Sequence, residues 1–206
     1  QVWDETNDGL ETLPKNIDAL VQQIDKAAQV FWSDPGRHKT GRLNLRKARY
    51  EICNNGIGLD GQFDDDIRWA IADKCGQLMF EKTTLYPDAI STLNKLRHNK
   101  VKLALVTNGT SSAQRKKINK FDLEYHFDHI QIEGEAGIGK HELEAYKKAL
   151  TALGVGASET WMVGDNLEWE VIAPQKLGIF SIWRDPQGDG TLPKNTTAKP
   201  DMIITK

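Results

Sequence analysis

The sequence has little cysteine and no long hydrophobic run. Cys53 and Cys75 are its only cysteines, and they form no C-x-x-C pair, so neither a disulfide framework nor a zinc site is indicated. The longest apolar stretches, residues 101–106 and 179–183, are far shorter than the ~20 residues that cross a bilayer, and no signal peptide opens the sequence. We therefore expect a cytoplasmic protein with two buried free thiols and no membrane partner.

An excess of charge of one sign is also missing. The formal net charge is -2 at pH 7, and no basic stripe runs along any predicted helix, which excludes the usual electrostatic basis of nucleic-acid binding. Any anion must then be bound by a local arrangement of side chains. This favours a pocket for a small molecule.

The first part of the chain has a purely helical pattern. Apolar residues recur every three or four positions between residues 13 and 80, and no strand pattern occurs there. Breaks at residues 34–36 and 54–61 divide this region into three or four helices. We expect a small helical bundle over residues 12–84.

After Pro87 the pattern changes to strands that alternate with helices. This order is typical of an α/β domain with a parallel sheet covered by helices on both faces. The short strands are apolar without alternation, as expected when both faces are buried. The predicted strands cover residues 101–106, 129–132, 161–163, 179–183 and 202–204. The predicted helices cover residues 88–98, 112–120, 143–153 and 167–177, and residues 186–199 form a long loop.

Polar residues follow the first of these strands. Thr107, Asn108 and Gly109 stand where the carboxyl end of a parallel strand usually meets a ligand. A hydroxyl and the backbone N–H groups that follow it can bind a phosphoryl oxygen. Because Asn-Gly is also a common turn pair, this segment alone leaves an ordinary turn equally open.

A lysine and a group of acids follow at later positions. Lys140 stands just before a predicted helix and could offset the charge of a phosphate, although most lysines are solvated surface residues. Asp165 follows a buried strand and a glycine, with Glu168 and Glu170 in the next helical turn. Carboxylates of this kind suit Mg²⁺, and acids in a first helical turn also complement the helix dipole.

Taken in order, these three segments resemble the second, third and fourth motifs of the haloacid dehalogenase (HAD) superfamily. The resemblance covers residues 86–204 and implies a Rossmann-like α/β core formed by residues 1–11 and 85–206, with the helical bundle inserted as a cap. It implies that Thr107 and Asn108, with Gly109 beside them, bind the transferring phosphoryl group and that Lys140 steadies its charge. Asp165 would bind Mg²⁺, and Glu170 or Glu168 would be the second acid.

The start of the chain departs from the family pattern. Family members begin with a strand that ends in Asp-x-Asp-x-Thr/Val, whose first aspartate attacks phosphorus, and no such motif occurs here. The missing strand would lie between the strands that end at Val106 and Val163, where its absence would leave backbone groups unpaired. We therefore expect about 10 to 20 further residues before Gln1, the length of one strand with its motif.

The resemblance implies Mg²⁺-dependent hydrolysis of a small phosphomonoester through an aspartyl-phosphate. Two alternatives stay open: a catalytically inactive scaffold that binds phosphate or a protein, and a metal-independent dehalogenase-type hydrolase. The acid pair Asp165 and Glu170 favours the phosphatase, because without a cation it would repel a nucleophilic aspartate.

The cap would set the choice of substrate. The residues that could line the pocket are Trp32, Arg37, His38, Arg42 and Arg46. Their arginines could bind a second anionic group, but Arg42, Arg46 and Arg49 are also compatible with a solvated helix face. The sequence leaves the substrate and the oligomeric state open.

Overall fold

The computed structural model describes residues 17–57 and 64–205. The chain divides into two compact units, Gln1–Tyr86 and Pro87–Lys206. The division falls in the segment where the sequence pattern changes from helical to alternating. The prediction that residues 1–11 belong to the α/β core lies outside the described residues.

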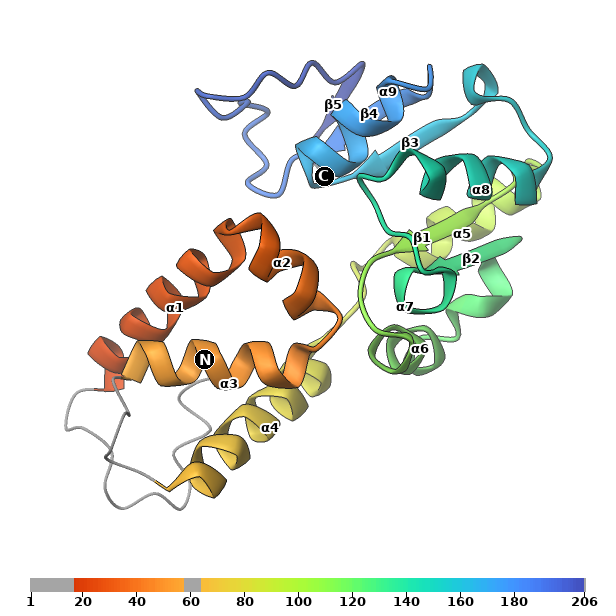
Figure 1. Ribbon diagram of the computed structural model, residues 1–206. Helices are drawn as coiled ribbons and strands as arrows, with labels where there is room; N and C mark the ends of the chain where they lie inside the picture. Colours follow the sequence, from red (N-terminus) through yellow and green to blue (C-terminus); the bar gives the residue numbers. More distant parts are fainter. Residues whose placement is uncertain (1–16, 58–63, 206) are drawn as a thin grey trace. The chain divides into compact units, whose positions relative to one another are not determined.

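The first unit consists of helices, and no strand occurs among its described residues, as predicted. Its helices are α1 (Ile17–Ser33), α2 (Pro35–Arg42), α3 (Leu45–Ile57) and α4 (Asp65–Lys82) (Figure 1). The start of α2 is fixed locally: the Asp34 side chain accepts a hydrogen bond of 2.7 Å from Arg37 N, and Pro35 occupies the first helical turn.

The helices of this unit pack on a small apolar core. Ile24 and Phe31 of α1 meet Ala48 and Ile52 of α3, and all four are almost completely buried. Gly56 allows the close approach of α3 to α1, because a Cβ there would lie 2.7 Å from Ile24 Cα. The core is thus formed mainly between α1 and α3.

Two further contacts connect α3 to α4. The Tyr50 and Trp69 rings stack with centroids 4.1 Å apart, and Arg46 lies over Trp69 while binding Asp73 through two hydrogen bonds of 2.7 and 2.9 Å. Cys53 and Cys75 are both buried and free, as predicted.

The second unit alternates helices and parallel strands. Its strands are β1 (Ala104–Thr107), β2 (His129–Ile132), β3 (Trp161–Gly164), β4 (Phe180–Arg184) and β5 (Met202–Ile204). Its helices are α5 (Ala89–His98), α6 (Ser111–Lys120), α7 (Glu133–Ala136), α8 (Leu143–Leu153), the π-helical segment η4 (Leu167–Ile172) and α9 (Ala173–Gln175). Short 3₁₀ turns occur at Leu123–His126 and Ala157–Glu159. The mixed α/β class predicted from the sequence is confirmed.

The first strand is shorter at its start than the sequence pattern predicts. Leu103 N donates to the Asp128 carboxylate (2.8 Å), and Leu103 O accepts from Asp128 N (2.8 Å), so its backbone bonds are made to a turn before β1 begins. Lys100, the residue before the predicted strand, has a positive φ of 59°, so the chain turns there. Residues 101–103 therefore lead into the strand without belonging to it.

The strands form two hydrogen-bonded groups, both parallel. β1 pairs with β2, and β3 pairs with β4, which pairs with β5. In the described part of the chain, no strand pairs with the second edge of β1 or with that of β3. Tyr146 of α8 shares a buried cluster with Ala173 and Ile179, against which Met162 of β3 packs. Since α8 also contacts β1 and β2, it connects the two groups of strands.

The predicted α-helix over residues 167–177 is a different structure. It consists of η4, a π-helix, followed by the single turn of α9. Pro174 has no N–H to donate to the carbonyl of residue 170, so a regular α-helical ladder cannot run through this segment. Wider π turns of this kind are often found at functional sites.

The predicted long loop contains neither helix nor strand between β4 and β5. The Asp185 carboxylate is buried and accepts hydrogen bonds from Gln187 N (2.8 Å) and Gly190 N (2.7 Å), which fixes the start of the loop. None of the described helices has the length and apolar character that would let it cross a membrane.

Candidate active site

Asn108, the residue directly after β1, forms a backbone clamp with Lys140, which lies between α7 and α8. Its side-chain Oδ1 accepts a hydrogen bond of 2.6 Å from Lys140 N, and its Nδ2 donates one of 3.1 Å to Lys140 O. Gln114 Nε2 donates to Asn108 O (2.9 Å), so both side chain and backbone of Asn108 are held. Asn108 and Lys140, both predicted from the sequence as site residues, are therefore in direct contact.

Lys140 connects this clamp to the end of β3. Its Nζ lies 2.6 Å from Glu170 Oε1, and the other oxygen of Glu170 accepts a hydrogen bond of 2.7 Å from Asn166 N. Glu170 is almost completely buried. The lysine is thus a paired, partly buried cation rather than a solvated surface residue.

The buried side chain of Glu170 has room over the end of β3 because residue 164 is a glycine. A Cβ at residue 164 would overlap the Glu170 side chain and come within 2.7 Å of its Cδ. The π-helical segment is capped by Asn166, whose Oδ1 accepts from Trp169 N (3.0 Å), and Tyr146 donates a hydrogen bond of 2.5 Å to Trp169 O. Burial raises the pKa of the Tyr146 hydroxyl, which keeps this donor protonated.

Asp165 is placed differently from Glu170. It follows β3 and is exposed, and its backbone carbonyl accepts a hydrogen bond of 2.9 Å from Trp183 Nε1. Among the described residues, none binds its carboxylate by a hydrogen bond or an ion pair, which leaves both oxygens accessible. Glu168 is also exposed and does not join the Lys140 pair.

Thr107 and Gly109 flank the Asn108 clamp. Thr107 ends β1, and its hydroxyl makes only a long contact of 3.5 Å with Asn108 O. Gly109 has a positive φ of 116°, which glycine adopts without strain. Its N–H donates a hydrogen bond of 3.0 Å to the Glu133 carboxylate.

Sequence reasoning missed Glu133, Gln114 and Asn166. Glu133 lies immediately after β2, and Asn166 lies two residues after the end of β3. The rule that ligands bind at strand ends could therefore have included both. Gln114 gave no such signal, because its role depends on how α6 packs beside β1.

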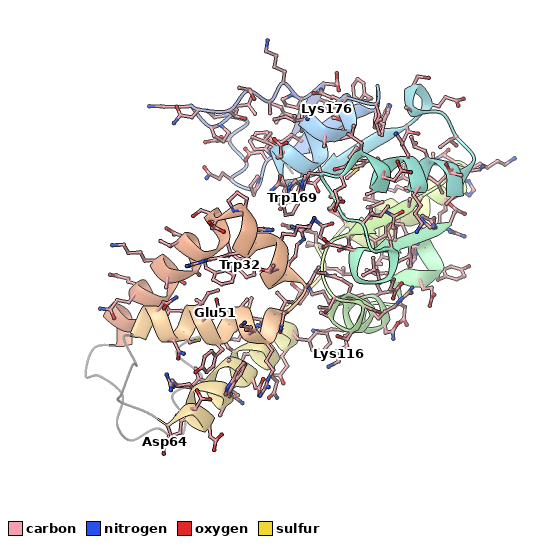
Figure 2. The ribbon with its side chains drawn as sticks, in the orientation of Figure 1. Trp32, Glu51, Asp64, Lys116, Trp169 and Lys176 are labelled. Atoms are coloured by element: carbon pink, nitrogen blue, oxygen red, sulfur yellow. The ribbon has the colours of Figure 1, made fainter. Side chains whose placement is uncertain are left out.

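Among the cap residues proposed from the sequence, Trp32, His38 and Arg42 lie together. Trp32, labelled in Figure 2, is on the last turn of α1, and its ring centroid lies 5.4 Å from that of His38. Arg42 is buried with its Nη1 3.2 Å from His38 Nδ1, so it does not lie on a solvated face. Arg37 lies over the Phe31 ring (6.0 Å), while Arg46 is engaged by Asp73 and Trp69 in a different part of the unit.

Comparison with known proteins identifies relatives of this chain. The profile of the haloacid dehalogenase-like hydrolase family matches residues 1–178. A phosphoserine phosphatase from Thermus thermophilus is 38% identical over 120 residues, which are 58% of this chain and 47% of that protein. A glyceraldehyde 3-phosphate phosphatase from Methanocaldococcus jannaschii is 32% identical over 97 residues, 47% of this chain and 42% of that protein.

The fold also has solved counterparts. The structure of the HAD-hydrolase YfnB from Bacillus subtilis, bound to magnesium, has a TM-score of 0.75 at 19% identity and covers 100% of this chain and 84% of that one. A HAD phosphatase from Thermococcus onnurineus has a TM-score of 0.57 at 26% identity, and the match covers 90% of this chain and 83% of that one.

The chain spans about half the length of the first curated relatives that it matches. The family match covers most of the chain, and the relatives named above are phosphatases of that family. This protein therefore belongs to the haloacid dehalogenase-like hydrolase family.

Proposed function

We propose that the protein hydrolyses a small phosphomonoester in a Mg²⁺-dependent reaction. The observation that carries this proposal is the connected network in which Asn108 binds the Lys140 backbone and the Lys140 ammonium binds Glu170. It links the ends of β1 and β3, where an open parallel sheet binds its ligand. The phosphatase names of the relatives support the same reaction.

Each residue has a separate role in this proposal. Thr107, Asn108 and Gly109 form the turn that receives the phosphoryl group. The Lys140 ammonium has three donors and uses one for Glu170, so the others can approach a phosphoryl oxygen. A fixed cation at this point stabilises negative charge that develops during phosphoryl transfer.

Asp165 fits as a ligand of Mg²⁺. The described residues contain no group of three metal-ligating side chains, but Mg²⁺ commonly binds through one or two carboxylates together with water and phosphate oxygens. The exposed Asp165 carboxylate meets this requirement, whereas the two oxygens of Glu170, the second acid predicted from the sequence, bind Lys140 Nζ and Asn166 N. Bound Mg²⁺ would offset charge on the phosphoryl group.

We infer that the nucleophilic aspartate is supplied by a further strand that pairs with β1 and β3. Support comes from the second edges of these strands, which pair with no described strand, and from Trp161 and Val163 of β3, which are 67% and 53% exposed. Unpaired backbone and exposed apolar side chains on a parallel strand are normally covered.

The reaction that follows has two balanced steps. An aspartate oxygen attacks phosphorus, the bond from phosphorus to the leaving oxygen breaks, and the alcohol departs after taking up a proton from solvent, to which the attacking water of the second step returns one. Water then attacks the aspartyl-phosphate, which releases inorganic phosphate and restores the carboxylate. In this proposal the first unit is the cap that selects the substrate, with Trp32, His38 and Arg42 as its binding residues.

We further infer a cytoplasmic location and a small phosphorylated metabolite as the partner, with no nucleic acid and no membrane. The relatives named above act on phosphoserine and glyceraldehyde 3-phosphate according to their names. Both are small phosphomonoesters.

The test is hydrolysis of p-nitrophenyl phosphate by the natively encoded protein and by the 206-residue chain, each with Mg²⁺ and with EDTA. Mg²⁺-dependent turnover by the native protein supports the proposal, and turnover limited to a form longer than the 206-residue chain supports the inferred strand. Asp165→Asn should abolish the Mg²⁺ response. Phosphate binding without turnover in every form would favour an inactive scaffold, and release of halide from a 2-haloacid without metal would favour a dehalogenase.

A further inference from the structure

Glu133 is a buried carboxylate at the candidate active site that has no part in the function proposed above. It is the first residue of α7, directly after β2, and is 4% exposed. Its Oε2 accepts the hydrogen bond of 3.0 Å from Gly109 N, and the next residue, Gly134, donates from its backbone N to Gly109 O (3.0 Å). Both backbone polar groups of Gly109 are therefore held from the end of β2.

The same side chain packs against the backbone that leads into Lys140. A Cβ at Gly139 would lie 2.6 Å from both Cδ and Oε1 of Glu133, and 2.9 Å from Asn108 Oδ1. Only a glycine leaves room for this contact. Glu133 thus touches the residue after Asn108 and the residue before Lys140, the two partners of the backbone clamp.

We propose that Glu133 is a positioning residue that sets the geometry of the Asn108–Lys140 clamp and, through it, of the Lys140 ammonium. A hydrogen bond to a carboxylate is stronger than one to a neutral acceptor, so an ionised Glu133 fixes Gly109 N–H more firmly than a neutral side chain would. The role of Glu133 in positioning the clamp does not depend on the proposed function. Only the further step, that the clamp takes part in phosphate binding, rests on that function.

A chemical consequence follows for the bound phosphoryl group. Because Gly109 N–H is already bound to a carboxylate, it is not a free donor to phosphate, and a second anion close to it would be repelled. Recognition then depends on the Thr107 hydroxyl and the Lys140 ammonium. In this arrangement Gly109 contributes the left-handed turn rather than a hydrogen bond to the substrate.

The test compares amide hydrogen exchange at Gly109, measured by NMR on the 206-residue chain, in wild type and variants. Glu133→Ala should accelerate exchange about 10-fold or more, since a charge-assisted hydrogen bond is lost. Glu133→Gln keeps an acceptor and nearly the same volume but loses the charge, so exchange should be accelerated less than in Glu133→Ala. Glu135→Ala is the matched control: this side chain lies two residues away but binds Arg115 and Ser111 on the surface.

Equal exchange at Gly109 in wild type and Glu133→Ala would overturn the inference, as would equal acceleration in Glu133→Ala and Glu135→Ala. Gly139→Ala provides a second test that keeps Glu133 in place. Its new Cβ should displace the carboxylate and accelerate exchange at Gly109. Adding Gly139→Ala to Glu133→Ala should accelerate exchange less than Gly139→Ala does in wild type, because only the contact of 2.9 Å with Asn108 Oδ1 then remains. Fully additive effects would contradict the contact between residues 133 and 139.

Activity separates this inference from the proposed function. If the native protein hydrolyses p-nitrophenyl phosphate, Glu133→Ala should lower kcat about 10-fold or more, while Glu133→Gln should restore it to within about threefold. If no form turns over substrate, the proposed function fails, but accelerated exchange at Gly109 in Glu133→Ala alone would still support the positioning role. Unchanged kcat in Glu133→Ala would overturn it.

Discussion

At the scale of single residues, the Lys140–Glu170 pair shows how burial changes the meaning of a charged side chain. The Lys140 side chain is 16% exposed and that of Glu170 3%, whereas the Lys147–Glu144 pair of α8 is 54% and 67% exposed. A buried ion that loses its partner keeps its desolvation cost, while an exposed one is solvated by water.

Lys140→Met is therefore expected to lower the free energy of unfolding by about 3 kcal/mol, because it leaves Glu170 buried without its cation. Lys147→Met should change it by less than about 1 kcal/mol. Urea unfolding followed by circular dichroism measures both. Equal effects of the two substitutions would mean that the Lys140–Glu170 pair contributes no more than a surface pair.

A second residue-scale prediction concerns pH. Hydrogen bonds from Arg115 and then from Ser111 lower the pKa of the Glu135 carboxyl from 4.5 to about 2. Because the folded pKa is the lower one, the stabilising contribution of the carboxylate is present above pH 4.5 and is lost as the pH falls toward 2. The stability difference between wild type and Glu135→Gln should accordingly shrink over this range, and an NMR titration of Glu135 with a midpoint near 4.5 would contradict the prediction.

At the scale of elements, the end of β3 and the π-helical segment η4 depend on each other. Gly164 ends the strand, and the wider turn that follows brings Glu170 back over it, where its carboxylate meets Lys140 and Asn166. Neither element would place the Glu170 carboxylate at this point by itself.

Gly164→Ala should therefore destabilise the protein by about 1–3 kcal/mol, since the new methyl group overlaps the Glu170 side chain. The same substitution in a Glu170→Ala background should cost less, because the overlapping atoms are gone. A double-mutant cycle by thermal or urea unfolding measures the coupling. Additive effects would show that Gly164 is needed for some reason other than this contact.

At the scale of the whole molecule, the reactivity of the two cysteines of the first unit distinguishes the folded protein from the unfolded one. Burial, and for Cys53 also the nearby Cys75, raises the pKa of both thiols to about 12. The thiolate is the reactive form, so the native protein should react with 5,5'-dithiobis(2-nitrobenzoate) at pH 8 about 100-fold more slowly than the protein in urea. Stability should fall as the pH rises from 9.0 toward 12, because the unfolded chain releases these protons first. Rapid modification of both thiols in the native protein would contradict their burial.

The sequence by itself determined the division between helical and alternating patterns, the α/β class and most element positions. Helical periodicity and short apolar strands are local properties, so they can be read without the fold. The limits of β2, α8 and β5 agree with the prediction. Thr107 and Asp165 were proposed as site residues because they follow apolar strands, and Lys140 was proposed because it precedes a predicted helix.

Only the tertiary structure decided how these residues are paired. The Asn108 clamp on Lys140, the ion pair of Lys140 with Glu170 and the hydrogen bond of Gly109 to Glu133 join residues 24 to 32 positions apart. The π-helical turn was also missed, because it depends on Pro174 and on the space above Gly164 rather than on periodicity. Side chains distant in sequence are brought together by packing, and their hydrogen bonds and burial then decide which charges are paired and which, like Asp165, stay accessible.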